Sequence, residues 1–222
     1  MRDTLKTKTY FDEYISEESE RARKFINKIA SGTLAADRVL PVKRKLFSIR
    51  INLLIAEYSA GLSIDELRRE FLQIAGTAED CWNTESYDEK LRLLALCVLF
   101  NAGDDIKDRV AKFIRETGEY DCLIESLCSD ELEDGSSLCY PGVYAELWDV
   151  LCGGDIAIIR GYLQKKWYIS HRDSYWYDSH KAKEKLYFGY WAFEVAALMK
   201  AMKMDAAGLN GIEYFPYDLY CY

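Results

Sequence analysis

The sequence predicts an all-α protein, and two observations carry this prediction. Apolar residues recur at helical spacing between breakers, and no useful length of chain alternates apolar and polar residues as a half-buried strand does. Only three prolines interrupt the 222 residues, so the periodic segments are long. At the usual helix length, the pattern indicates roughly eight to ten helices.

The N-terminal part predicts three helices. The segment from Tyr10 to Ala30 mixes apolar residues with many charges, which is typical of an exposed amphipathic helix. A second helix is expected from about Pro41 to Ala60, with Gly61 as its C-terminal stop. Ser63 and Glu66 match a capping box, which opens a helix that ends near residue 76.

The middle of the chain predicts a buried helix followed by an exposed one. Ser86 and Glu89 form a second capping box, and residues 91–100 after them are apolar nearly all round, as in a central buried helix. Gly103 ends that helix. Asp104 and Asp105 then begin another, where two carboxylates at the N-terminus suit the helix macrodipole.

The C-terminal half predicts further helices around loops. A short helix over 121–127 leads to an acidic loop at 129–135, and Pro141 lies early in a helix that ends at Gly153 and Gly154. Asp155 can cap the next helix, to about 169, and residues 181–200 are expected to form the last long helix. We expect a helical module over 1–103 packed on a second over 104–222, whose last third is rich in aromatic residues.

The charge balance excludes some partners. The chain has 29 Lys and Arg against 37 Asp and Glu, a net charge of -8 that repels nucleic acid and anionic lipid. Residues 1–60 carry +4, residues 61–160 carry -13 and residues 161–222 carry +1. An acidic surface attracts basic proteins, including those that handle nucleic acid.

Four clusters hold most of this acidity. They are Glu85, Asp88 and Glu89; Asp104, Asp105 and Asp108; Glu119 and Asp121; and Asp130, Glu131, Glu133 and Asp134. One such cluster alone is typical of a solvated loop or helix end. Four within one hundred residues predict a surface that speeds association with a basic partner, and the last three clusters are the candidate partner-binding residues.

The cysteines and the N-terminus indicate a reduced cytoplasmic protein. The seven cysteines are odd in number, form no C-x-x-C pair and lack zinc-ligand spacing. The first residues have no apolar signal-peptide core, and the longest strictly apolar stretch, 93–100, is far below the ~20 residues that cross a bilayer.

No catalytic or phosphate-binding motif supports an enzyme. The chain lacks G-x-S-x-G, G-x-x-x-x-G-K-[ST] and G-x-G-x-x-G, so no catalytic residue and no cofactor is expected. The one candidate metal cluster is His171, Asp173, Asp178 and His180, whose spacing fits no helical ligand pair. Glu194 lies among apolar neighbours, and a satisfied structural carboxyl is favoured there over a catalytic acid.

Aromatic strings in the last third carry a family resemblance. The strings are Lys166-Trp-Tyr, Tyr175-Trp-Tyr-Asp-Ser-His-Lys181, Tyr187-Phe-Gly-Tyr-Trp-Ala-Phe-Glu194 and Tyr214-Phe-Pro-Tyr-Asp218. They resemble the C-terminal module of the PoNi immunity proteins, and Tyr10-Phe-Asp-Glu-Tyr with the helices up to about residue 100 is similar to the N-terminal module. The resemblance therefore covers nearly the whole chain.

The resemblance implies an all-helical, non-enzymatic antitoxin. PoNi proteins bind cognate PoNe toxins, which are DNases delivered between bacteria, often by type VI secretion, and neutralise them in the cytoplasm. The matching aromatic strings indicate scaffold, so a structural core is expected to include Trp176, Tyr190, Trp191, Glu194 and Tyr217. Specificity is then expected in the acidic surface.

Two other functions stay open at this point. A helical adaptor for another basic protein shares every feature except the aromatic strings. A metal-dependent enzyme built on the two histidines and two aspartates is the second alternative. The sequence leaves self-association undecided.

Overall fold

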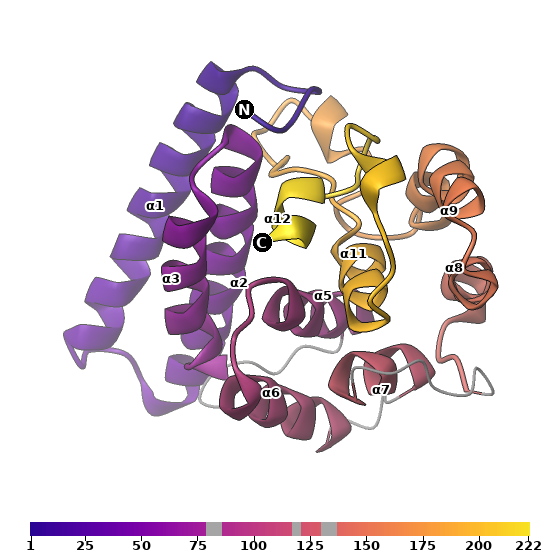
Figure 1. The fold of residues 1–222 in the computed structure, drawn as a ribbon. Helices are drawn as coiled ribbons and strands as arrows, with labels where there is room; N and C mark the ends of the chain where they lie inside the picture. The colour runs from indigo at the N-terminus through magenta and orange to yellow at the C-terminus, as the bar shows by residue number, and fades with distance from the viewer. Residues whose placement is uncertain (79–85, 117–120, 130–136) are drawn as a thin grey trace. The chain divides into compact units, whose positions relative to one another are not determined.

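The computed structural model confirms the all-α prediction (Figure 1). It describes residues 1–78, 86–116, 121–129 and 137–222, and these contain helices and no β-strand. The chain divides into two compact units, one of residues 1–83 with 178–189, the other of residues 84–177 with 190–222. Residues 84–103 thus belong to the second unit, and the expected division at residue 103 stays a prediction from the sequence.

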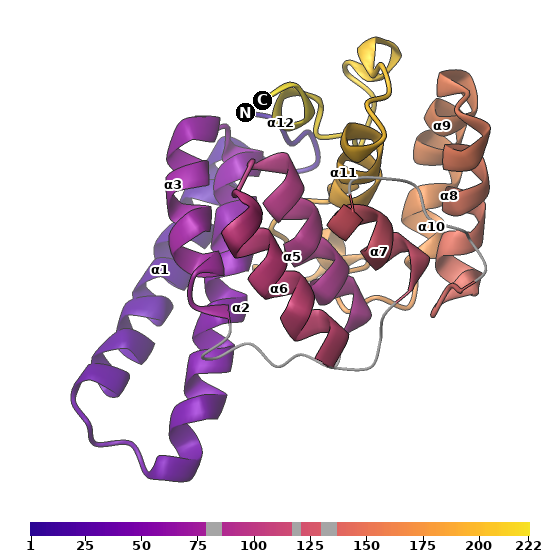
Figure 2. The ribbon, with the colours of Figure 1, turned by 60° about the horizontal axis from the view of Figure 1, so that its bottom comes forward.

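The first unit is built on a long helical hairpin. Its helices are α1 (Lys8–Ala30), α2 (Ala36–Ala60) and α3 (Ile64–Ala75), with a short 3-10 turn at Ser179–Lys181. α1 and α2 pack along each other, and their seam buries Ala22, Ile49 and Leu53. α3 covers only the end of α2 that lies away from the α1–α2 loop, so the loop end of the hairpin extends beyond it (Figure 2).

Capping explains where these helices begin and end. Ser63 Oγ accepts from the backbone N–H of Glu66, as the capping box predicts, and Gly61 ends α2 at φ 101°. The expected start of α2 at Pro41 is wrong, because the helix begins at Ala36 and holds Pro41 in its second turn. Pro41 lies past the first turn, where proline is best tolerated, so α2 continues there without the helical hydrogen bond from residue 41 to the carbonyl of Asp37.

The second unit surrounds a buried helix, as the apolar run predicts. α5 (Tyr87–Leu99) buries side chains around its circumference and packs chiefly on α11 (Phe193–Ala201). The other helices are α6 (Asp104–Glu116), α7 (Cys122–Ser129), α8 (Pro141–Gly153), α9 (Ile156–Tyr162), a π-helical turn (Leu163–Trp167), α10 (Tyr168–Ser170), a 3-10 turn (Ala207–Leu209) and α12 (Tyr217–Cys221). The predicted caps at Ser86 and Asp155 are both present.

The expected long helix over 181–200 is wrong, because only Phe193–Ala201 is helical there. Tyr187 and Phe188 are instead anchored by distant side chains of the first unit. Tyr10 Oη lies 3.0 Å from both the N–H and the carbonyl of Tyr187, and Ser59 Oγ donates to the Phe188 carbonyl at 2.9 Å. Gly189, at φ 121°, adopts a conformation that helices do not contain.

The structure shows the state of the described cysteines and whether a described helix could span a membrane. Each described cysteine is a free thiol: Cys97, Cys122, Cys128, Cys139, Cys152 and Cys221. In the part of the chain that the structure describes, no helix combines the length and apolar character of a bilayer-spanning segment.

Candidate partner-binding surface

The start of α6 presents three candidate carboxylates to solvent. Asp104, Asp105 and Asp108 are all exposed, and they lie within the first two turns of the helix. Among the described residues, the one ion pair of Asp105 is a long, exposed contact of 3.8 Å with Arg109. Such a pair contributes little to stability, so these carboxylates are available to a partner.

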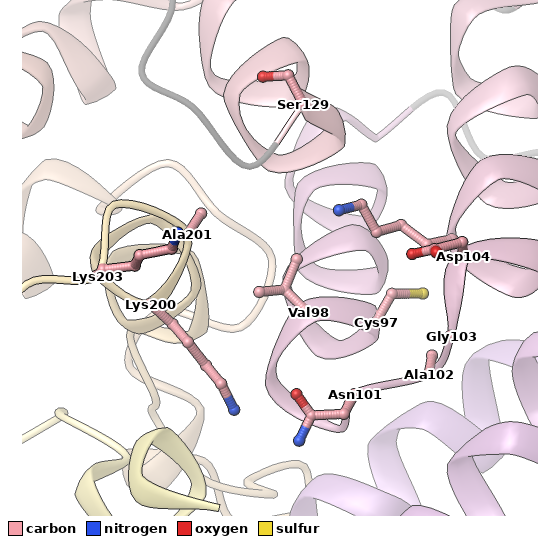
Figure 3. A pocket seen from close by; sticks show the side chains of 11 residues that line it. Cys97, Val98, Asn101, Ala102, Gly103, Asp104, Ser129, Lys200, Ala201 and Lys203 are labelled. Atoms are coloured by element: carbon pink, nitrogen blue, oxygen red, sulfur yellow. The ribbon is translucent and has the colours of Figure 1, made fainter.

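The surroundings of this acidic group are not uniformly acidic. A pocket of about 550 Å³ opens beside Asp104, and its lining includes Lys107, Lys200 and Lys203 (Figure 3). Lys200 Nζ donates to the carbonyl of Leu99 at 3.3 Å, at the C-terminal end of α5. That contact is the favourable placement of a cation at a helix C-terminus, and it gives this lysine a structural role.

Asp121 does not belong with the exposed candidates, because its side chain is only 2 % exposed. Its Oδ1 accepts from the backbone N–H groups of Leu123 and Ile124, which caps α7. Its Oδ2 accepts from Tyr87 Oη at 2.7 Å and from the N–H of Cys139 at 3.0 Å. The expectation that Asp121 faces a partner is therefore corrected, since this carboxylate holds three segments of the scaffold together.

Of the other acidic cluster residues, Asp88 is also structural, and several lie outside the described residues. Asp88 is half-buried and accepts from Tyr144 Oη at 2.9 Å and from Ser174 Oγ at 2.6 Å, so it too serves the scaffold. Glu85 of the first cluster lies outside the described residues, as do the partner-binding candidates Glu119, Asp130, Glu131, Glu133 and Asp134. Sequence reasoning missed the structural use of Asp88 because its partners lie 56 and 86 residues away.

Glu194 is a buried structural carboxyl. It is 8 % exposed, and its Oε1 accepts from Trp167 Nε1 at 2.5 Å. Burial raises the pKa of this carboxyl, while the nearby His171 and the Trp167 hydrogen bond oppose the rise. The carboxyl thus has a satisfied partner, as the sequence favours.

Several aromatic residues of the last third form a packed cluster in the second unit. Trp176 and Tyr190 are buried with ring centroids 5.3 Å apart, and Trp176 stacks on Trp167 at 5.7 Å. Trp191 and Tyr217 are half-buried. This packing buries most rings of the strings, which therefore serve mainly as scaffold, although Tyr175 is 58% exposed.

The four residues of the metal alternative do not share one environment. His171 is 4 % exposed, and its Nδ1 donates to the Trp167 carbonyl at 2.8 Å. Asp173 is exposed beside Arg172, whereas Asp178 and His180 belong to the first unit. Within the described ranges, no three His, Cys, Asp or Glu side chains gather as a metal-ligand group.

These features define a class of protein: a helical binding protein that buries its conspicuous aromatic and polar residues and exposes charged helix ends. Two family profiles match almost the whole chain, PoNe immunity protein (PoNi), N-terminal, over residues 2–112, and PoNe immunity proteins (PoNi), C-terminal, over residues 119–219. The chain belongs to the PoNi family of PoNe immunity proteins. It is therefore an immunity protein, an inhibitor of a toxin rather than an enzyme.

A solved structure has the same fold. The chain resembles the crystal structure of protein PA2201 from Pseudomonas aeruginosa with a TM-score of 0.69 and 19% sequence identity, over 94% of this chain and 86% of that one. A search of curated proteins finds no significant match.

Proposed function

We propose that this immunity protein neutralises a DNase toxin of interbacterial competition by binding it in the cytoplasm through an acidic surface. Type VI secretion as the route of toxin delivery is part of the same proposal. The observation that carries the acidic surface is the group of exposed carboxylates Asp104, Asp105 and Asp108 at the start of α6.

The chemistry of a DNase supports this choice of surface. An enzyme that cleaves DNA must present positive charge to the phosphate backbone, so its groove or an adjacent face is basic. Opposite charges steer two proteins together and fix their register. Asp104 and Asp108 lie four residues apart on one face of α6, where both can meet the same basic face.

The immunity function is tested by protection. Candidate toxins are sought among the proteins encoded beside this chain, and one that bears a nuclease domain is expressed in cells with or without the immunity protein. Survival and intact chromosomal DNA are expected only with co-expression, together with a stoichiometric complex on purification. Continued DNA degradation despite comparable expression would contradict the DNase proposal.

The acidic surface is tested by charge reversal. We expect Asp104→Lys with Asp105→Lys and Asp108→Lys to slow association with the inactivated toxin about tenfold or more at low salt, with a smaller effect at high salt. Stopped-flow or surface-based kinetics measure the rate. The matched control reverses three exposed carboxylates of the same unit: Asp149, Asp173 and Glu213. Equal rates for the two triple variants at every salt concentration would refute the surface and leave the immunity function standing.

A further inference from the structure

The loop end of the α1–α2 hairpin is the most basic part of the chain. This hairpin tip, residues 21–45, carries eight Lys and Arg and one acidic residue, Asp37, for a net charge of +7. The other 197 residues carry -15. The tip extends beyond α3 at the end of the hairpin (Figure 2).

Most cations of the tip make no ion pair with the described residues of the fold. Arg21 and Lys24 pair with Glu18 and Glu20. Among the described residues, no carboxylate lies within ion-pair distance of the other six tip cations: Arg23, Lys28, Arg38, Lys43, Arg44 and Lys45.

One of these placements opposes helix stability, and another leaves a buried polar atom unsatisfied. Arg38 lies in the first turn of α2, where a positive charge is unfavourable to the macrodipole. Arg44 is half-buried, and its Nε has no hydrogen-bond partner among the described residues. A cation that does not stabilise its own fold points to a role in binding another molecule.

Apolar side chains accompany the cations. Ile26 on α1 is 48% exposed and Leu40 on α2 is 41% exposed. Exposed apolar side chains in a charged segment suit a protein partner, whose interface combines apolar and charged contacts. Nucleic acid is less suited, because the one aromatic residue of the tip, Phe25, is partly buried against the α1–α2 seam and offers no open ring for base stacking.

We propose that the hairpin tip is a second docking element, which binds an acidic, partly apolar face of the toxin. The proposal rests on the immunity function above and deepens it. The carboxylates at the start of α6 and the cations of the tip then require a toxin that presents faces of both signs. A toxin with the wrong sign at either face meets like charge, so the two elements together favour the cognate partner.

Charge reversal at the tip tests the proposal. We expect Lys28→Glu with Lys43→Glu and Lys45→Glu to slow association with the inactivated cognate toxin about tenfold at low salt, with a smaller effect at high salt. The matched control is Lys8→Glu with Lys181→Glu and Lys183→Glu, which makes the same charge change at exposed residues of the same unit outside the tip. Circular dichroism and thermal melting verify that both variants fold. A tip variant that folds and associates like the control overturns the proposal.

The apolar residues provide a second measurement. Replacement of Ile26 and Leu40 by Ser is expected to speed dissociation of the complex with little effect on association, because short-range contacts act mainly on the dissociation rate. An unchanged dissociation rate in the folded double variant overturns the apolar part of the docking element.

Other anionic partners are tested with the protein alone. Wild-type chain is mixed with a 20-base-pair DNA duplex or with vesicles rich in phosphatidylserine at the same salt. We expect no binding that depends on the tip, and tip-dependent binding to either probe would overturn the choice of a protein partner. If protection fails altogether, the proposed function fails; if protection holds and the tip variant binds normally, only this inference fails.

Discussion

At the scale of single residues, buried polar groups that pair across long sequence distances hold the scaffold together. Asp121 joins Tyr87 to the start of α7, and Glu194 receives the indole N–H of Trp167. In the first unit, Tyr187 Oη donates to Asp3. Removing one partner of such a pair leaves the other buried without a hydrogen bond, which costs more than the bond itself contributes.

Glu194 offers a paired test of this cost. Glu194→Ala is expected to destabilise the protein by about 2–5 kcal/mol, because it leaves Trp167 Nε1 unpaired beside a cavity. Glu194→Gln keeps an acceptor and is expected to change stability by only about 1 kcal/mol. Since burial raises the pKa of the carboxyl, ionising it costs stability as pH rises, and the Gln variant should gain on the wild type in that direction. Urea unfolding at several pH values measures all three effects; equal losses for Ala and Gln would contradict the pairing.

A substitution at Asp121 distinguishes a role in the scaffold from a role in toxin binding. Asp121→Ala is expected to lower the free energy of unfolding by about 2–4 kcal/mol, through loss of the α7 cap and of the Tyr87 partner. Association with the toxin at a temperature where the variant is folded should be unchanged. Denaturant unfolding and binding kinetics check the two parts, and slower association without destabilisation would restore Asp121 to the partner surface.

Glu57 gives the first unit a pH dependence. Burial and the carboxylates of Glu70 and Glu66 raise the pKa of Glu57 to about 8. The folded state then holds a proton that the unfolded state releases near pH 4.5, so stability falls as pH rises from about 4.5 to about 8. Glu57→Gln has no titratable proton at this position, so its stability should change less with pH between about 4.5 and about 8. Melting temperatures from pH 4 to 9 measure it, and parallel profiles would count against the raised pKa.

At the scale of elements, short sequence signals predict helix starts well and irregular segments poorly. Ser63, Ser86 and Asp155 each accept a backbone N–H at the helix start that the sequence indicates. A cap acts within three residues, so its signal is local. The helix that the sequence predicts in the segment before α11 is wrong. The partners that hold this segment in an irregular conformation, Tyr10 and Ser59, lie more than 120 residues away and leave no local signal.

Replacement of Pro41 tests how much the missing helical hydrogen bond costs α2. A proline in the second turn cannot donate the helical hydrogen bond to the residue four positions earlier, Asp37. Pro41→Ala restores that bond and is expected to stabilise the protein by about 1–3 kcal/mol. Thermal and denaturant unfolding measure the gain. A loss of stability would mean that the proline itself is needed to fix the start of α2.

At the scale of the whole molecule, charge is separated along the chain. The hairpin tip carries +7 and the rest of the chain -15, although the net charge is only -8. An average of this kind conceals a basic segment in an otherwise acidic chain, and each sign has its own expected partner face. Binding to one toxin through both elements should therefore affect the stability of the entire chain.

Toxin binding is expected to stabilise the folded chain by mass action. At a free toxin concentration of 100 times Kd, the free energy of unfolding should rise by about 2.7 kcal/mol. Hydrogen exchange with inactivated toxin measures this rise and reports the protected segments. Protection is expected at the start of α6 and at the hairpin tip; protection confined to other segments would contradict both surfaces.

The sequence by itself determined the all-α class, the capped helix starts, the buried helix α5 and the scaffold nature of the aromatic strings. These follow from periodicity and from contacts only a few residues long, which the order of residues records directly. Only the tertiary structure decided that Asp121 and Asp88 are structural while Asp104, Asp105 and Asp108 face solvent. The reason is physical: an aspartate has the same charge in every cluster, and its burial depends on partners that folding brings from distant positions.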